Sequence, residues 1–155
     1  MAKKKPQQPK SIQNRRARHD YELGDDLIVG IELTGGETKL LRLGHGHLQG
    51  AYVTVKDDQL WLFNATIHGT NGIQLTEMEQ TRTRRLLARR RQIDEFIAAK
   101  QQGRTIVPLQ ILTQGRYIKL RIATGRGRKK WDKRQVLKQR DDKRASESAI
   151  KARFK

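Results

Sequence analysis

A few histidines and carboxylates are the residues of this chain that could support metal binding or acid–base catalysis. His45 and His47 stand two residues apart in the glycine-rich segment GHGH. A histidine pair can bind a metal, but a site needs further ligands, and the chain has no cysteine and no obvious third ligand here. Asp57 and Asp58 have the character of turn residues, not of a catalytic carboxylate pair. We therefore expect no metal, no cofactor and no catalytic residue.

The chain is rich in positively charged residues. It holds 34 Lys and Arg against 16 Asp and Glu, with a formal net charge of +18. Residues 1–18 hold seven cations and no acid, and residues 126–155 hold thirteen cations and four acids. Residues 19–125, with fourteen cations and twelve acids, are nearly neutral. Dense positive charge repels itself unless it meets a polyanion, so this distribution predicts nucleic-acid binding.

The composition also indicates where in the cell the protein is located. The absence of cysteine excludes disulfides and fits a reducing environment. No apolar run approaches the roughly 18 residues of a membrane-spanning helix. The first residues, MAKKKPQQPK, lack the apolar segment of a secretory signal. We expect a cytoplasmic protein that does not attach to a membrane.

The elements that must position the cations can be predicted from hydrophobic patterns. Strand-like runs occupy residues 27–33, 39–43, 51–55, 59–63, 105–112 and 116–123. The segment TGGE favours a hairpin turn between the first two runs, and KDD favours one between the next two. Residues 81–103 have apolar residues at helical spacing and are predicted to form one helix. Pro108 predicts an edge or a bulge in its strand.

Six short strands and one amphipathic helix favour a mainly β fold. The leading prediction is a six-stranded antiparallel β-barrel of the oligonucleotide-binding (OB) type with accessory helices, and an open α+β sheet is the alternative. The predicted organisation is a basic N-terminal arm (1–18), the OB-like barrel (19–124) and a basic C-terminal tail (125–155). The tail lacks apolar residues for a core, so we expect it to be disordered alone and helical when bound to RNA.

Several segments together resemble one family. NRRARHDY (14–21), GIELTGGETKLLRLG (30–44), TRTRRLLARRRQID (81–94), IVPLQIL (106–112) and GRKKWDKR (127–134) occur in order and at nearly the spacing of the SsrA-binding protein, or small protein B, family. The resemblance extends from Asn14 to about Arg144. Departures from the family pattern, such as His47, Gly50 and Trp131, concern fine contacts and leave the resemblance intact.

The resemblance implies a non-enzymatic RNA-binding protein with an OB-like barrel. It implies binding to the tRNA-like domain of transfer-messenger RNA (tmRNA) and delivery of that RNA to stalled 70S ribosomes, the process called trans-translation. The tail would be read by small-subunit ribosomal RNA in the decoding centre and the empty mRNA channel. Alanyl-tRNA synthetase and elongation factor Tu would be indirect partners through the RNA. We expect a monomer.

The predicted site residues fall into two groups. Those for tmRNA are Asn14, Arg15, Arg16, Arg18, His19, Tyr21, Glu37, Lys39, Arg42, Tyr52, Arg82 and Arg84. Those for the decoding centre and mRNA channel are Arg128, Lys129, Trp131, Asp132, Lys133, Arg134, Lys138 and Arg140. The cations suit phosphates, and the aromatic residues suit stacked bases.

Three alternatives remain open at the level of sequence. Glu37 can accept hydrogen bonds from base edges, or it can form a salt bridge within a hairpin. The arginines of residues 82–91 favour phosphate contact, but they can also form a solvated helix face. In function, the chain can be a ribosomal or general RNA-chaperone protein, or an RNA-processing enzyme that uses His45, His47 and Glu37.

Overall fold

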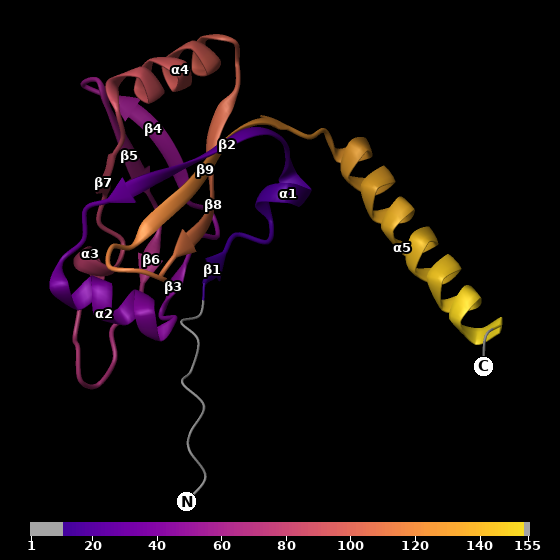
Figure 1. Ribbon diagram of the computed structural model, residues 1–155, viewed down its shortest axis with the longest axis horizontal. Helices are drawn as coiled ribbons and strands as arrows, with labels where there is room; N and C mark the ends of the chain where they lie inside the picture. Colours follow the sequence, from indigo (N-terminus) through magenta and orange to yellow (C-terminus); the bar gives the residue numbers. More distant parts are fainter. Residues whose placement is uncertain (1–10, 154–155) are drawn as a thin grey trace, which may run out of the picture.

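The computed structural model describes residues 11–153, apart from the side chain of Trp131. The first ten residues of the predicted arm, and the predicted role of Trp131 as a base platform, therefore lie outside the described residues. Figure 1 shows a body of strands and short helices from which one long C-terminal helix projects. No helix in the described part is long and apolar enough to cross a membrane.

Six antiparallel strands form a ring. They are β2 (Tyr21–Ile31), β4 (Tyr52–Lys56), β5 (Gln59–Phe63), β7 (Arg84–Leu87), β8 (Thr105–Leu112) and β9 (Lys119–Gly127). Their order is β8-β4-β5-β7-β2-β9, and β9 pairs back onto β8 to complete the circuit. The β4–β8 seam is narrow, with one register pair between Val53 and Ile106. The ring is therefore close to a barrel.

Short strands and helices complete the structure. The short strands are β1 (Ile12–Gln13), which pairs with β8, and β3 (Gly46–His47), which pairs with β6 (Thr66–Ile67). The helices are α1 (Ala17–Asp20), α2 (Gly35–Leu43), α3 (Glu77–Gln80), α4 (Arg90–Gln101) and α5 (Lys130–Arg153). Because the helices together hold more residues than the strands, the described fold is mixed α/β rather than mainly β.

The predicted strand at residues 39–43 is wrong, because this segment belongs to helix α2. The Thr34 side chain accepts a hydrogen bond from the Glu37 N–H, and the Glu37 carboxylate accepts one from the Thr34 N–H. This reciprocal capping box starts the helix. Gly44 ends it in the left-handed conformation, with φ of 87°. The predicted hairpin of residues 27–43 is accordingly absent.

The predicted helix over residues 81–103 is only half correct. Its first part is strand β7, and α4 begins at Arg90. In β7 the burial alternates: Arg84 and Leu86 point inward, and Arg85 and Leu87 are exposed. Pairing with β5 on one side and β2 on the other fixes this segment as the sixth strand of the ring. Tertiary pairing thus overrides the helix propensity of its Arg and Leu residues.

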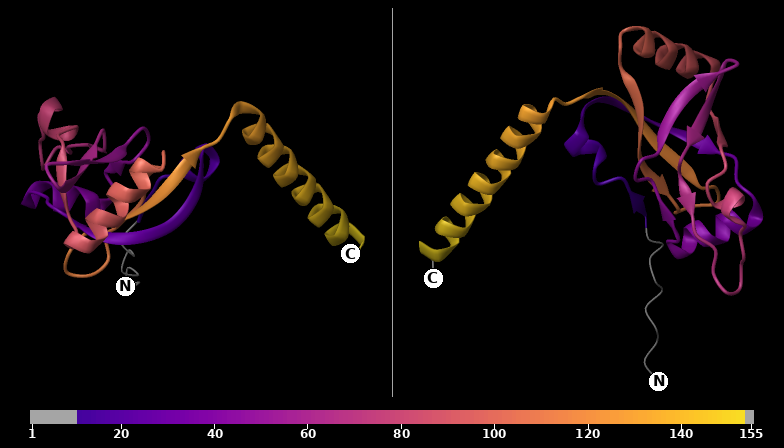
Figure 2. Two further views of the ribbon diagram at one scale, coloured as in Figure 1. Left: turned by 90° about the horizontal axis from the view of Figure 1, so that it is seen from above. Right: turned by 180° about the vertical axis from the view of Figure 1, so that it is seen from behind.

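The core fills the ring and both of its ends. Leu60, Leu62, Leu120 and Ile122 are fully buried inside the strands. Helix α2 adds buried leucines at one end of the ring, and α4 adds Ile93 and Phe96 at the other (Figures 1 and 2). Burying each such side chain contributes roughly 1.5–3 kcal/mol. The predicted β4–β5 hairpin is confirmed, and so is the irregularity at Pro108, where the register between β8 and β9 shifts.

Both predicted basic segments are attached more firmly than the sequence indicates. Ile12 and Ala17 are buried, so the described end of the predicted arm packs on the ring. Strand β9 continues to Gly127, two residues beyond the predicted start of the tail. Gly125 is buried, and a Cβ there would lie 3.1 Å from the Cβ of Tyr21. The glycine therefore permits close packing of β9 against β2.

Candidate nucleic-acid interface

An ion cluster of Glu37, Arg82 and Arg84 joins α2 to β7. Arg84 Nη2 lies 2.8 Å from Glu37 Oε1, and Arg82 Nη2 lies 2.6 Å from Glu37 Oε2. Glu37 and Arg84 are 1% and 0% exposed. The Arg84 guanidinium also donates hydrogen bonds to backbone carbonyls at positions 65, 79, 80 and 82. One buried arginine thereby ties α2, the residue before β6 and the end of α3 to β7.

The opposite charges of this cluster stabilise one another within the protein. Burial alone would raise the pKa of Glu37, but hydrogen bonds from Arg82 and Thr34 and the charge of Arg84 lower it overall. Glu37 therefore stays ionised at neutral pH, beside Arg84, whose own pKa is lowered by burial. Because Glu37 and Arg84 face the interior, the geometry does not support their predicted direct contact with RNA. Of the two alternatives for Glu37, an internal salt bridge is the observed one, although it joins a helix to a strand.

Two more predicted RNA contacts anchor backbone. The Arg42 guanidinium donates to the carbonyls of Thr113, Gly115 and Arg116 and so holds the β8–β9 turn against α2. Asn14 donates from its side chain to Pro108 O at 3.0 Å, which fastens the N-terminal segment at the irregularity in β8. Both side chains therefore use their donors in hydrogen bonds to backbone carbonyls within the protein.

Six predicted residues meet in one cleft between the ring and α5, which we call the tail cleft. It has a volume of about 840 Å³, and its predicted lining residues are Asn14, Arg15, Arg18, Tyr21, Arg128 and Arg140. Arg121 also lines it, with Nε 3.3 Å from Asp26 Oδ2. The buried Nε of Arg128 has no hydrogen-bond partner. Such a cleft has the charge and the unused donor that suit a phosphate group.

Asp20 joins the base of α5 to the ring. Its carboxylate Oδ1 lies 3.0 Å from Lys133 Nζ and 3.0 Å from His19 Nδ1. Its carbonyl accepts a hydrogen bond from the Arg128 N–H at 2.9 Å. The Asp132 carboxylate caps the start of α5 by accepting from the Lys129 N–H. Thus His19, Lys133 and Asp132, all predicted to contact RNA, also set where the tail helix starts.

Replacing Asp20 with Asn should loosen this joint. An exposed ion pair contributes about 0.2–1 kcal/mol, so we expect a roughly 1.4- to 5-fold rise in the detached population of the first turn of α5. Spin labels at Gln101 and Gln135, both exposed, would report it as a broader distance distribution. The matched control is Asp25→Asn, which changes a neighbouring exposed carboxylate. An unchanged distribution in Asp20→Asn would show that the ion pair does not hold the helix.

The joint should also depend on pH in a defined direction. Hydrogen bonds from His19 and Lys133 lower the pKa of Asp20. The stabilisation is therefore fully present above the unfolded-state value of about 4 and is lost as pH falls through the lower folded value. We expect no loss of the joint through Asp20 titration between pH 5 and pH 8.

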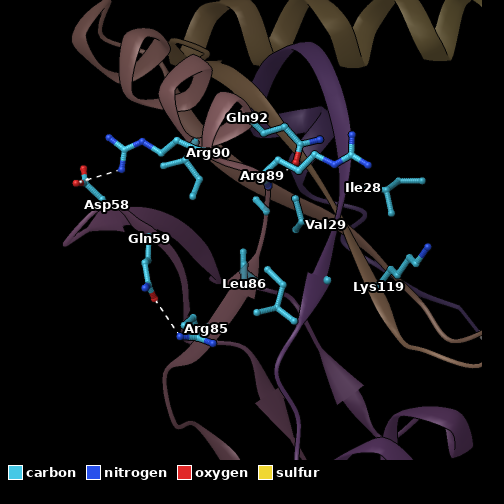
Figure 3. A pocket seen from close by; sticks show the side chains of 14 residues that line it. Ile28, Val29, Asp58, Gln59, Arg85, Leu86, Arg89, Arg90, Gln92 and Lys119 are labelled. Atoms are coloured by element: carbon cyan, nitrogen blue, oxygen red, sulfur yellow. Dashed lines mark hydrogen bonds and ion pairs between the residues drawn. The ribbon is translucent and has the colours of Figure 1, made fainter.

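A second surface, which we call the sheet groove, opens between β2, β7 and the start of α4 (Figure 3). Its volume is about 890 Å³. Its floor includes two exposed apolar side chains, Ile28 at 43% and Leu87 at 51% exposure. Arg85, Arg89 and Lys119 stand around this floor. Exposed apolar surface rimmed by cations suits a nucleic-acid strand, because bases pack on the floor and phosphates meet the rim.

The sheet groove was not predicted as a site from the sequence. Ile28 and Leu87 are unremarkable within apolar runs, and Lys119 is an isolated cation in a strand. Register pairs of Gly30 with Lys119 and with Leu87 bring β9 and β7 residues together. The one sequence feature that indicated it was the run of arginines in residues 82–91, which were expected to contact phosphates. These arginines were predicted to lie on a helix, whereas Arg85 and Arg89 line the groove.

The remaining predicted residues lie outside both surfaces. Arg16 is exposed beside α1, Lys39 is exposed on α2, and Tyr52 is exposed on β4. Lys129, Arg134 and Lys138 are exposed at the start of α5 or along it. His45, His47 and His68 are also exposed, and no group of residues able to hold a metal exists within the described part of the chain.

A ring of strands with an arginine-lined cleft, a groove rimmed by cations and a projecting basic helix defines a nucleic-acid-binding protein. The model of the SmpB protein family matches residues 11–152. This chain therefore belongs to the SmpB family, which confirms the resemblance seen in the sequence. Family membership also confirms the prediction that the chain is not an enzyme.

Individual relatives agree over nearly the full length. An SsrA-binding protein from a Nostoc species is 41% identical over 140 residues, covering 89% of this chain and 90% of the relative. One from Pseudomonas putida is 38% identical over 158 residues, covering 100% of this chain and 99% of the relative. A solved structure described as "tmRNA-SmpB: a journey to the center of the bacterial ribosome" matches with a TM-score of 0.64 and 32% identity. It covers 79% of this chain and 87% of its own.

Proposed function

We propose that this chain binds the tRNA-like domain of tmRNA and delivers it to stalled ribosomes for trans-translation. The observation that carries the proposal is the family match over residues 11–152, which includes the ring, both basic surfaces and most of α5. The relatives are named for binding SsrA RNA, and the similar solved structure concerns tmRNA, SmpB and the bacterial ribosome. The net charge of +18 supports a polyanionic partner.

The ring supports an OB-type interpretation. Its strands are antiparallel and close on themselves, and α4 lies across one end between β7 and β8 (Figure 1). In barrels of this type an outer strand face and adjoining loops bind nucleic acid. We assign that role to the sheet groove, where apolar floor and cationic rim lie on the outside of β2 and β7.

The two basic surfaces support a division of labour. The sheet groove takes tmRNA, as do the tail-cleft residues Arg15, Arg18 and Tyr21 that were predicted for it, and α5 takes small-subunit ribosomal RNA in the decoding centre and mRNA channel. Cations surround most of α5, which suits a channel walled by phosphates. We expect the protein to act as a cytoplasmic monomer, with alanyl-tRNA synthetase and elongation factor Tu as indirect partners through the RNA. We also expect the part of α5 beyond its first turn, which Lys133 and Asp20 join to the ring, to be helical when bound and disordered when free.

The assignment of the sheet groove can be tested by removing one charge. Lys119→Gln should weaken tmRNA binding and reduce the slope of log affinity against log salt by about 1, because one phosphate contact is lost. Fluorescence anisotropy at several salt concentrations measures both quantities. The matched control is Arg91→Gln, since Arg91 is 93% exposed on α4 and does not line the groove. Equal losses in both variants would contradict the assignment.

The function itself is tested by competition. Purified protein should bind tmRNA in preference to an unrelated structured RNA of similar length at near-physiological salt. A ribosomal or general RNA-chaperone protein would show no such preference and would associate with ribosomes whether or not they are stalled.

A further inference from the structure

Three of the chain's eight aromatic residues lie on one outer face of the β4–β5 hairpin. They are Tyr52, Trp61 and Phe63, which we call the aromatic face. Leu60 and Leu62 alternate with them and are 0% exposed, so Trp61 and Phe63 point outward. Tyr52 is 44% exposed. The aromatic side chains lie outside the core, so core packing does not explain why three of them share one face.

The rings of the aromatic face are held in fixed orientations. Tyr52 and Phe63 are register neighbours, with ring centroids 5.3 Å apart and planes 5° from parallel. The indole N–H of Trp61 donates to Lys56 O at 3.2 Å. A ring held in this way loses little conformational freedom when a further flat group stacks on it.

Positive charge lies on both sides of Trp61. Its register neighbour in β7 is Arg85, and its register neighbour in β4 is Thr54, whose hydroxyl accepts a hydrogen bond from Lys100 Nζ at 3.1 Å. The nearby carboxylates are paired with arginines, Glu32 with Arg85 at 2.9 Å and Asp58 with Arg90 at 3.1 Å. Stacking rings beside cations favour a ligand that combines flat bases with phosphates.

The aromatic face is continuous with the sheet groove. Gln59 and Arg85 line the groove: Gln59 lies on β5, the strand of Trp61 and Phe63, and Arg85 lies on β7 as the register neighbour of Trp61. Arg85 Nη1 lies 3.4 Å from Gln59 Oε1, a contact drawn in Figure 3. A strand of RNA that leaves the groove across β7 therefore meets Trp61 next and then the Tyr52–Phe63 pair.

We propose that the aromatic face binds unpaired bases of the RNA that occupies the sheet groove. The ligand is single-stranded RNA, held by stacking on Tyr52 and Trp61 and by phosphate contacts of Arg85 and Lys100. This inference rests on the proposed function, because it requires RNA in the groove. It adds a preference for a single-stranded segment next to a folded one.

The test uses two synthetic RNAs that share one hairpin stem. One is blunt, and the other extends the stem with eight unpaired adenylates. The wild-type protein should bind the extended RNA more tightly. Tyr52→Ala should weaken binding of the extended RNA by roughly 5- to 150-fold, the loss typical of one stacked base, and should leave the blunt RNA unchanged. Tyr52→Phe should bind like the wild type, because it keeps the ring. Anisotropy titrations measure all affinities.

Two comparisons separate stacking from other effects. Tyr117→Ala removes a tyrosine that is 66% exposed in the β8–β9 turn, away from the aromatic face, and should change neither affinity. Trp61→Leu should repeat the selective loss of Tyr52→Ala. Thermal unfolding of each variant shows whether the fold is intact.

Several outcomes would overturn the inference. It fails if the wild type does not prefer the extended RNA, or if Tyr52→Ala in a folded protein weakens both RNAs equally or neither. Failure of the proposed function is distinct, because it appears as loss of preference for tmRNA over an unrelated structured RNA. A normal tmRNA preference with an unchanged Tyr52→Ala affinity would contradict only the aromatic face.

Discussion

Arg84→Met is expected to lower the free energy of unfolding by about 3–5 kcal/mol, the largest loss of stability that we predict for a single substitution. Methionine fills much of the volume of arginine but cannot donate hydrogen bonds. The Glu37 carboxylate, 1% exposed, would keep only Arg82 and the Thr34 N–H as partners. Four backbone carbonyls would also lose a donor. Urea unfolding at pH 7 measures this change.

The control for this prediction is Arg85→Met, one residue further along the same strand. Arg85 is exposed, and its ion pair with Glu32 is solvated, so the expected loss is below about 1 kcal/mol. A double variant, Glu37→Leu with Arg84→Met, should recover part of the stability, because no buried charge is left unpaired. A loss in Arg84→Met no larger than in Arg85→Met would show that the cluster does not hold the ring together.

The same cluster predicts how stability depends on pH. Because the arginines and Thr34 lower the pKa of Glu37 overall, its contribution is fully present above the unfolded value of about 4.3. It is lost as pH falls through the lower folded pKa. Unfolding midpoints should therefore fall more steeply below pH 4 in the wild type than in the Glu37→Leu, Arg84→Met double variant.

Truncation after Gly127 is expected to abolish tagging of stalled translation products while tmRNA binding stays mostly intact. The cut keeps β9, whose last residue pairs with Tyr21. It removes α5 and with it the basic surface proposed to enter the decoding centre and mRNA channel. The sheet groove contains no residue beyond Lys119, so its RNA contacts remain. Tagging in a reconstituted translation system and anisotropy with tmRNA give the two readouts.

The division of labour depends on this contrast. A full-length protein with Arg134 and Lys138 changed to Gln is a useful comparison, because both side chains are exposed on α5. It should reduce tagging without altering the fold. If truncation after Gly127 abolished tmRNA binding as completely as tagging, the proposed separation between groove and tail would be wrong.

Local sequence patterns predicted the elements whose conformation is determined by residues nearby in the sequence. The β4–β5 hairpin follows from the alternation of Leu60 and Leu62 with outward residues. The segment from Thr34 to Glu37 contains a capping-box pattern, which could have identified α2, but the paired glycines favoured a turn instead. Strand β7 could not be predicted in this way, because its conformation depends on pairing with β5 and β2.

The environment of the site residues also depends on contacts between residues far apart in the sequence, which local patterns do not predict. The sequence shows that Arg84 is a cation, but not that Glu37, 47 positions earlier, neutralises it in the interior. The resemblance nevertheless led to residues of the N-terminal segment and the tail that the fold brings together in the tail cleft. The sheet groove depends on register between β2, β7 and β9, which no local pattern contains.

The most direct test of tmRNA binding is the identity of the RNA that co-purifies with the protein under native conditions. Sequencing of the bound RNA should show strong enrichment of tmRNA for the wild type and for the protein truncated after Gly127. The enrichment should fall for Lys119→Gln and remain for Arg91→Gln. Recovery of ribosomal RNA alone, in amounts that do not change when ribosomes stall, would contradict a tmRNA-binding function for this chain.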